Sequence, residues 1–285
     1  MQILRRAVAF AALSASTACA HAINYPSPNG PRYVGGPATP RTVDHREHPN
    51  ELRVVTFNAE DADHVDSTIR LLQTAAPLTG ADVITLQEMD APATRQVADA
   101  LGMYYVYYPA SIARNHRDFG EAVLSRWPIV DDEKVILPHL ARLDKSERIA
   151  TGVTIMVDTV PVRVYSMHLG TFVDVSRGSK RDQARAILAA ADSYPRVIIA
   201  GDANSHDVGK TFRDAGYLWI TEHNPSTVHW WNWDHVFSRG LDPSPGRDIR
   251  TGVEDARGAS DHRPVWAVFS LQAPASAGME RAAGQ

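Results

Sequence analysis

Polar side chains that follow or precede apolar runs are the feature that most constrains this chain. Gly201-Asp202-Ala203-Asn204 follows the apolar run 197–200, and Ser260-Asp261-His262-Arg263-Pro264 precedes the apolar stretch 265–271. Either segment alone would be a turn. The same arrangement recurs at four further places, Asn58, Glu88, His168 and Asp234. Six polar strand ends from across the chain predict one shared rim, where oxygen ligands, an aspartate and a histidine converge on a metal ion and a phosphate group.

The first 22 residues have the pattern of an export leader rather than of a folded segment. Arg5-Arg6 supplies a positive start, residues 7–13 form an apolar run, and the small residues of Ala20-His21-Ala22 favour cleavage after Ala22. The apolar run is too short to span a bilayer, so we expect no transmembrane segment. The sequence therefore predicts an exported protein, in the periplasm or secreted.

Cys19 is the only cysteine and leaves an alternative processing of the leader open. Cleavage in the frame Ala18-Cys19-Ala20 would give a lipoprotein, but Ser16 stands where such a signal calls for Leu or a similar apolar residue. We therefore favour the soluble form over a lipid anchor at Cys19. In either form the mature body has no second cysteine, so it forms no intrachain disulfide.

The charge of the chain limits the partners that it can hold. Without Arg5 and Arg6, 27 basic residues face 33 acidic ones, and the formal charge moves from −4 to −6. This balance argues against a stable complex with nucleic acid held by bulk electrostatics. A nuclease is still compatible with it, because a bound divalent ion locally reverses the sign of the field. We expect the protein to be a monomer. Nucleic acid would bind it only as a substrate and not in a stable complex.

Composition divides the chain into a lead-in, a domain and a tail. Residues 23–50 are rich in proline and glycine without an apolar period, so we expect an extended lead-in draped over the domain. Strands and helices then alternate over residues 51–272, and the Ala- and Gly-rich tail 273–285 is expected to fray. Composition and spacing alone predict a single mixed α/β domain.

Apolar periodicity places the elements of that domain. Helical spacing predicts helices over 64–76, from Pro92 to Gly102, and over 182–191. Strands are expected at 52–57, 83–87, 104–108, 121–124, 151–157, 162–168, 197–200, 235–237 and 265–271. Residues 151–168 should form a hairpin. The run 197–200 lacks alternation, so we expect it to be covered on both faces.

Seven motifs carry a family resemblance over residues 52–271. They are Thr56-Phe57-Asn58, Leu86-Gln87-Glu88, Leu124-Ser125-Arg126-Trp127-Pro128-Ile129, Met167-His168-Leu169, Gly201-Asp202-Ala203-Asn204, Trp233-Asp234-His235-Val236-Phe237 and Ser260-Asp261-His262-Arg263-Pro264. As a set, this chain resembles the endonuclease/exonuclease/phosphatase superfamily, which includes pancreatic-type deoxyribonucleases, abasic-site endonucleases, neutral sphingomyelinases and inositol polyphosphate phosphatases. The resemblance implies an α/β (α+β) four-layer sandwich, with two packed, mainly antiparallel β-sheets flanked by helices.

The resemblance also implies a metal site. In that superfamily the glutamate matching Glu88 is the principal metal ligand, the asparagine matching Asn58 lies close by, and Asp261 is a candidate second contact. A hard cation such as Mg²⁺, with Mn²⁺ as a substitute, takes one or two carboxylates plus water. Taken alone, Glu88 would be a capping acid before the helix at Pro92, and Asn58 would be a turn residue.

Five residues are candidates for catalysis. By resemblance, Asp202 orients or deprotonates the attacking water, while Asn204 holds the water or a phosphate oxygen. Strand alternation would put both on one side if the strand continues. Asp234 would fix the tautomer of His262 and stabilise an imidazolium that faces the phosphoryl group. His168 would contact phosphate or the leaving oxygen; a lone histidine there would more often be structural.

Further residues are candidates for contact with substrate. By resemblance to pancreatic-type deoxyribonucleases, Glu121 would hydrogen-bond His168. Arg148 is a candidate phosphate ligand, as is the basic cluster Arg177, Lys180, Arg181 and Arg185, although such a helix face is usually just solvated.

The tryptophans before Asp234 have two interpretations. In an extended segment, Trp230 and Asn232 would share the face of Asp234, and Trp231 and Trp233 would point into the core. Trp230 would then stack on a base or a lipid or inositol ring, or else pack in the core, which is the commoner fate.

Together these features predict an exported, Mg²⁺-dependent hydrolase of phosphate esters, most simply a phosphodiesterase or nuclease in which water attacks phosphorus in line. A sphingomyelinase or phospholipase and an inositol- or sugar-phosphate phosphatase are the alternatives. A non-catalytic binding module on the same fold is the rival from another class, and the intact set of catalytic residue types disfavours it.

Overall fold

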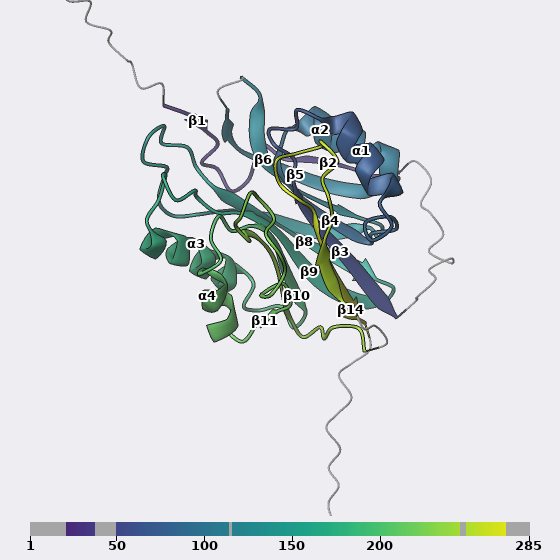
Figure 1. Cartoon of the computed structure of the whole chain (residues 1–285). Coiled ribbons are helices and arrows are strands. Elements are labelled where there is room, and N and C mark those ends of the chain that lie inside the picture. The colour runs from purple at the N-terminus through teal and green to yellow at the C-terminus, as the bar shows by residue number, and fades with distance from the viewer. Residues whose placement is uncertain (1–20, 38–49, 114–115, 246–248, 272–285) are drawn as a thin grey trace, which may run out of the picture.

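Two β-sheets packed face to face form the centre of the molecule, and helices cover their outer faces (Figure 1). This computed structural model describes residues 21–37, 50–113, 116–245 and 249–271. The predicted leader up to residue 20, with Cys19, and the tail 273–285 lie outside the described residues. Among the described residues, no helix has the length and apolar character that a membrane crossing requires.

The first sheet has eight strands. Their order is β1 (Ile23–Asn24), β5 (Tyr104–Ile112), β6 (Asp118–Ser125), β4 (Val83–Met89), β3 (Glu51–Asn58), β14 (Val265–Ser270) and β13 (Thr251–Val253), and β2 (Tyr33–Gly35) also pairs with β5. The second sheet has six, in the order β11 (Leu218–Trp219), β12 (Asp234–Arg239), β10 (Val197–Asp202), β9 (Val160–His168), β8 (Ile149–Val157) and β7 (Ile129–Ile136). The pairs β3/β4 and β9/β10 are parallel, and the other described pairs are antiparallel.

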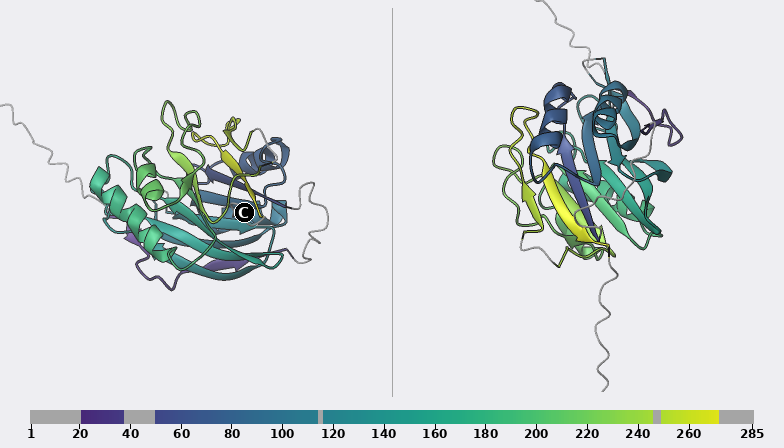
Figure 2. Two further views of the ribbon diagram at one scale, coloured as in Figure 1. Left: turned by 90° about the horizontal axis from the view of Figure 1, so that it is seen from below. Right: turned by 90° about the vertical axis from the view of Figure 1, so that its right-hand side faces the viewer.

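Four helices complete the described layers, and they lie in pairs on opposite sides of the sheets (Figure 2). These helices are α1 (Val65–Thr74), α2 (Ala91–Leu101), α3 (Arg177–Ala190) and α4 (Gly209–Asp214). One buried apolar cluster joins α1 and α2 to the first sheet, a second lies between the sheets, and a third joins α3 and α4 to the second sheet. The expected four-layer sandwich is therefore confirmed.

Local signals explain where the predicted elements begin and end. The Asp90 side chain accepts the Ala93 N–H at 2.7 Å to start α2, and Gly102 ends it with φ of +63°. The hairpin of β8 and β9 forms as expected, and every residue of β10 is buried.

Several elements depart from the sequence-based expectation, which also did not include β1, β2 and β13. Helix α3 begins at Arg177, five residues before the apolar period, because the Ser176 hydroxyl caps the Ser179 N–H. Strand β7 has the charged centre of an edge strand, and α4 and β11 are too short to show a period.

Residues 21–37, here called the N-terminal strap, lie along the open edge of β5. Strand β1 pairs with the end of β5, and β2 pairs with its start. Arg32 forms two hydrogen bonds to the Asp132 carboxylate of β7, and the Tyr25 hydroxyl donates to Asp118 at 2.8 Å. The described part of the predicted lead-in thus lies on the domain.

Candidate active site

Strand register brings three candidate residues into one row. Asp202 ends β10, and its Cα partners are His168, which ends β9, and Asp234, which begins β12. The row exists because β10 lies between a parallel and an antiparallel neighbour. Gly201 allows this approach: its φ is +149°, and a Cβ there would lie 1.9 Å from the Met167 carbonyl oxygen.

The first sheet brings Asn58 and Glu88 to the same place. Asn58 ends β3, and its Nδ2 donates to Glu88 Oε1 at 2.9 Å and to Asp202 Oδ2 at 3.2 Å. Glu88 lies at a bulge near the end of β4 and has φ of +59°. The bulge turns its side chain toward the facing sheet, so the two carboxylates approach one amide.

Burial disfavours the ionised form of both of these carboxylates. Burial raises the pKa of Glu88, although the Asn58 hydrogen bond opposes the shift. Burial also raises the pKa of Asp202 to about 7, and His262 acts against that shift. A bound cation would favour the ionised forms again, and carboxylate oxygens suit a hard divalent ion. The carboxylates of Glu88 and Asp202 therefore suit such an ion, and the Asn58 Nδ2 holds the two carboxylates together.

A second group of ligand atoms has a different character. Among the described residues, atoms of Asp202, Asp234 and His262 lie within 4.8 Å of one another. Asp234 Oδ2 is already 2.9 Å from His262 Nδ1, however, and a metal ion between them would have to break that hydrogen bond. We therefore assign these two residues to a dyad rather than to a metal.

Side-chain hydroxyls of neighbouring residues fix the backbone of both members of the dyad. The Thr227 hydroxyl oxygen accepts the Asp234 N–H, and the Ser260 hydroxyl oxygen accepts the His262 N–H while donating to the Asn58 carbonyl. Burial lowers the pKa of His262, but Asp234 and Asp202 together raise it to about 10. The ring is thus an imidazolium at neutral pH, with Nε2 3.7 Å from Asp202 Oδ2.

The pKa of His168 is shifted in the opposite direction to that of His262. Burial, reinforced by Arg148 and His262, lowers its pKa well below the usual range, so the ring is neutral. Its Nδ1 accepts from Arg148 Nη1 at 3.2 Å, which favours a proton on Nε2, 3.5 Å from Asp202 Oδ2. The buried Arg148 thus contacts His168 and approaches Asp174 at 3.9 Å, rather than standing free for phosphate.

Glu121 lies beside this pair without the expected hydrogen bond. Its Oε1 is 3.6 Å from His168 Nδ1, beyond ordinary hydrogen-bond distance. Burial raises the pKa of the fully buried Glu121 well above its usual range, and Arg148 acts against that shift. Burial thus favours the protonated form of the carboxyl beside the ring.

Asn204 reaches Asp202 by a turn and not by strand alternation. Strand β10 ends at Asp202, and Asn204 has φ of +48°. Its backbone N–H donates to Asp202 Oδ1 at 2.7 Å, and its Nδ2 donates to the Leu169 carbonyl at 3.0 Å. The amide thus stays near the site, but the expected strand geometry is wrong.

Asp261 and the tryptophan segment differ from expectation. Asp261 is exposed, and its backbone N–H donates to Glu60, so its carboxylate is outside the carboxylate pair above. Residues 228–231 form a tight turn with a bridge between Val228 and Trp231, so they are not extended. Trp230 is consequently exposed at the tip, and core packing is excluded for it.

The neighbours of Trp230 follow from the same turn. Trp231 and Trp233 stack on each other at 4.8 Å and are exposed or half-buried, where core positions were expected. Asn232 Nδ2 donates to the Thr221 and Asn224 carbonyls, which fixes the loop and takes the side chain away from the role of substrate contact.

Two residues near the site have structural roles that the sequence did not indicate: Lys180 was expected only as a candidate phosphate ligand, and Phe119 was not considered. Buried Lys180 donates to the Asn204 carbonyl at 2.5 Å, so it holds the Asp202–Asn204 turn instead of binding phosphate. The Phe119 ring lies 5.6 Å from the His168 ring and 5.0 Å from the Arg148 guanidinium. An apolar residue two positions before Glu121 was the available signal for it.

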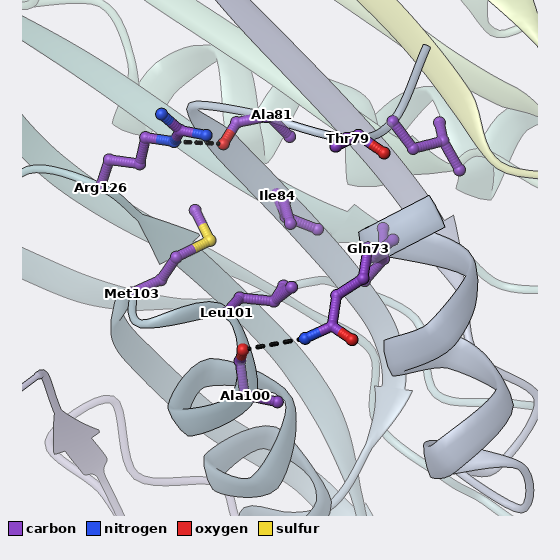
Figure 3. Close-up of a pocket in the computed structure, with 11 residues that line it drawn as sticks. Gln73, Thr79, Ala81, Ile84, Ala100, Leu101, Met103 and Arg126 are labelled. Carbon is purple, nitrogen blue, oxygen red and sulfur yellow. Dashed lines mark hydrogen bonds between the residues drawn. The ribbon is translucent and has the colours of Figure 1, made fainter. Parts of the chain in front are cut away.

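A separate pocket of about 240 Å³ lies at the other end of β4, between the ends of α1 and α2 (Figure 3). Arg126 borders it, and its Nε donates to the Ala81 carbonyl at 2.9 Å. This motif arginine therefore fixes the turn that starts β4. The pocket is not part of the catalytic constellation.

Comparison with known proteins agrees with this geometry. The model of the Endonuclease/Exonuclease/phosphatase family matches residues 55–262. The chain belongs to this family, whose members are typically metal-dependent phosphoesterases or nucleases. No curated protein is similar enough to count as a match.

Several solved structures share the fold. An endonuclease/exonuclease/phosphatase from Beutenbergia cavernae is 20% identical, with a TM-score of 0.64 over 78% of this chain and 72% of that one. A humanised D. rerio TDP2 is 16% identical, with a TM-score of 0.59 over 78% and 99%. Sphingomyelinase C from Streptomyces griseocarneus is 20% identical, with a TM-score of 0.57 over 77% and 99%. At these identities the likeness concerns the fold alone.

Proposed function

We propose that the protein is an exported, Mg²⁺-dependent phosphoesterase, most simply a phosphodiesterase or nuclease. The observation that carries the proposal is the position of Asp202, whose Oδ2 lies 3.5 Å from His168 Nε2 and 3.7 Å from His262 Nε2. A proton acceptor between a neutral and a cationic imidazole suits attack by water on a phosphate ester. The leader sequence supports export.

The residues divide the work of hydrolysis. Asp202, whose carboxylate lies near both imidazoles, accepts a proton from the attacking water. The oxygen of that water bonds to phosphorus as the bond to the leaving oxygen breaks. The His262 imidazolium, oriented by Asp234, stabilises the negative charge on the phosphoryl group and donates a proton to the leaving oxygen.

The metal would be held by Glu88, with Asn58 and Asp202 beside it. When bound, a divalent ion polarises a phosphoryl oxygen and offsets its charge. Arg148 keeps His168 neutral and oriented, so the His168 N–H can donate to a phosphate oxygen. A proton acceptor, a cationic imidazole and a neutral imidazole lie together here, and this disfavours the alternative of a non-catalytic binding module.

The test uses the purified mature protein with bis-p-nitrophenyl phosphate, DNA, RNA, sphingomyelin and inositol phosphates. We expect hydrolysis of at least one ester with Mg²⁺ or Mn²⁺ and its loss with chelator. Glu88→Gln should remove most of that activity and keep the fold, because it deletes one ligand charge from a solvent-accessible position. Activity of Glu88→Gln within about threefold of wild type, ~0.7 kcal/mol in the barrier, would remove Glu88 as the principal ligand.

A further inference from the structure

Large apolar side chains stand exposed on three loops. Six of the twelve such side chains in the described residues lie there. We call them the apolar rim: Leu140, Leu143, Phe172, Val173, Trp230 and Trp231. Trp230 is 83% exposed, Phe172 65% and Leu143 62%, so these are not marginal core residues. Exposed apolar groups gathered in one region mark an interaction site.

The three loops form one continuous surface. The Arg142 N–H, between the two leucines, donates to the Asp174 carbonyl next to Val173 at 3.0 Å. The Phe172 ring lies 6.4 Å from the Trp231 ring. Each loop therefore contacts the next, and the rim extends from Leu140 to Trp230 without a break in the chain of contacts.

The rim borders the candidate active site. The loop with Phe172 follows Leu169, whose carbonyl accepts from Asn204. The tryptophan loop is joined to the site at two points: the Trp233 carbonyl accepts the Ala203 N–H, and Val228 forms a β-bridge with His262. Whatever covers the rim therefore lies beside the segments that carry Asn204, Asp202 and His262.

The position of the rim decides between occupants. A protein partner or a second copy seated there would bring no phosphate ester to the neighbouring site, whereas a phospholipid surface would. Trp rings favour the lipid–water interface, and Leu and Phe favour the acyl boundary below it. Exposed Arg142 and Lys145 lie between and beside the leucines, as interfacial basic residues do.

Nucleic acid fits the rim less well. Leu140, Leu143 and Val173 offer no ring on which a base can stack. The formal charge of −4 opposes both polynucleotides and strongly anionic membranes. A surface of zwitterionic headgroups avoids that repulsion.

We propose that the apolar rim docks the protein on a zwitterionic phospholipid surface and presents the phosphodiester of a phospholipid to the active site. This inference rests on the proposed function, because it assigns a substrate class to the same site. The chemistry is the hydrolysis described above, with the phospholipid phosphodiester as the ester that water attacks.

The test compares two double variants of the mature chain. Phe172→Ser with Leu143→Ser removes two of the most exposed apolar side chains of the rim, neither of which has been assigned a role in substrate binding. Val34→Ser with Val130→Ser removes the same kind of exposed side chain from β2 and β7, outside the three rim loops. Circular dichroism and thermal melting confirm that both variants are folded.

Binding is measured by flotation with phosphatidylcholine vesicles in chelator, which keeps turnover out of the experiment. We expect the wild type and the control variant to float, and the rim variant to bind at least about tenfold more weakly, because it has lost two apolar side chains that the interface would bury. Hydrolysis of soluble bis-p-nitrophenyl phosphate should stay within about twofold for all three, since the substituted side chains are outside the catalytic and metal-binding groups, whereas hydrolysis of the vesicle lipid should fall with binding.

The outcomes separate this inference from the proposed function. A wild type that does not float, or a rim variant that floats equally well, overturns lipid docking even if the soluble ester is hydrolysed. Self-association, or oligonucleotide binding, that the rim substitutions abolish while flotation persists would assign the rim to those partners. Absence of hydrolysis of every ester with Mg²⁺ or Mn²⁺ refutes the proposed function, and the flotation result then stands by itself.

Discussion

At the scale of the residue, the hydrogen-bonded side chains of Asp234 and His262 act as one catalytic unit. The 2.9 Å hydrogen bond between them leaves Asp234 Oδ1 buried without a hydrogen-bond partner among the described residues. The carboxylate therefore acts chiefly on His262, by fixing its tautomer and stabilising its charge. Loss of either member should disable the unit.

We predict that Asp234→Asn and His262→Ala each slow turnover by about two to four decades, the usual range for acid–base and electrostatic groups. Asparagine keeps a hydrogen bond but favours the wrong tautomer and weakens the imidazolium. The double variant should be little worse than His262→Ala. Steady-state kinetics on one ester provides the measurement, and strict additivity of the two losses would mean that the residues act independently.

His235, next to the dyad, links stability to pH. It is fully buried, and its Nδ1 accepts from Trp219 Nε1 at 3.2 Å. Burial lowers its pKa to about 3, whereas an unfolded histidine titrates near 6.5. Because the unfolded chain binds the proton first, the stability that His235 contributes is complete above pH 6.5 and is lost as pH falls toward 3.

We therefore predict that His235→Gln flattens the acid limb of the stability curve. Between pH 7 and pH 5 the wild type should lose about 2 kcal/mol more unfolding free energy than this variant. Urea denaturation at the two pH values measures the difference, with His229→Gln at an exposed turn as the control. Equal losses in His235→Gln and the wild type would show that His235 does not carry the acid sensitivity.

At the scale of the element, β10 depends on one glycine. Gly201 combines a φ of +149° with the near contact to the Met167 carbonyl, so Gly201→Ala must move β10 away from β9. We predict a loss of about 3 kcal/mol or more in unfolding free energy. Gly216→Ala is the matched control, because Gly216 has φ of +84° and an added Cβ would meet no atom of the described residues within 4 Å, so it should cost only about 1–2 kcal/mol. Equal thermal shifts in the two variants would contradict the steric argument.

The elements also show what the sequence could predict. Long apolar runs such as that of β10, and capped helices such as α2, are recognisable because burial and capping leave local patterns. Strand β7 is not, because an edge strand with charged residues lacks an apolar period, and β1 and β2 depend on a partner far along the chain.

The residues of the site likewise divide into those that a local sequence pattern predicts and those that it does not. The strand ends Asn58, Glu88, His168 and Asp202 could be placed together because each directly follows an apolar run. The segment 228–233 could not, because a tight turn reverses which tryptophans are exposed, and turns depend on backbone contacts that side-chain patterns do not encode. The role of Arg148 against His168 likewise requires a contact between β9 and the residues before β8.

At the scale of the whole molecule, we predict export with removal of the leader. Expressed in a Gram-negative host, the protein should be found in the periplasm or medium with an N-terminus near Ile23. Intact-mass spectrometry measures this directly. A diacylglycerol-modified Cys19 at the new N-terminus would instead establish the lipoprotein form.

The N-terminal strap has a consequence for how the protein can be handled. Strands β1 and β2 together pair with both halves of β5, which otherwise would present a row of free N–H and C=O groups to neighbouring molecules. A version that starts at residue 50, just before β3, would leave that edge open and invite strand-to-strand aggregation even though every catalytic residue named here is retained. By covering the edge of β5, the N-terminal strap thus protects the protein from aggregation.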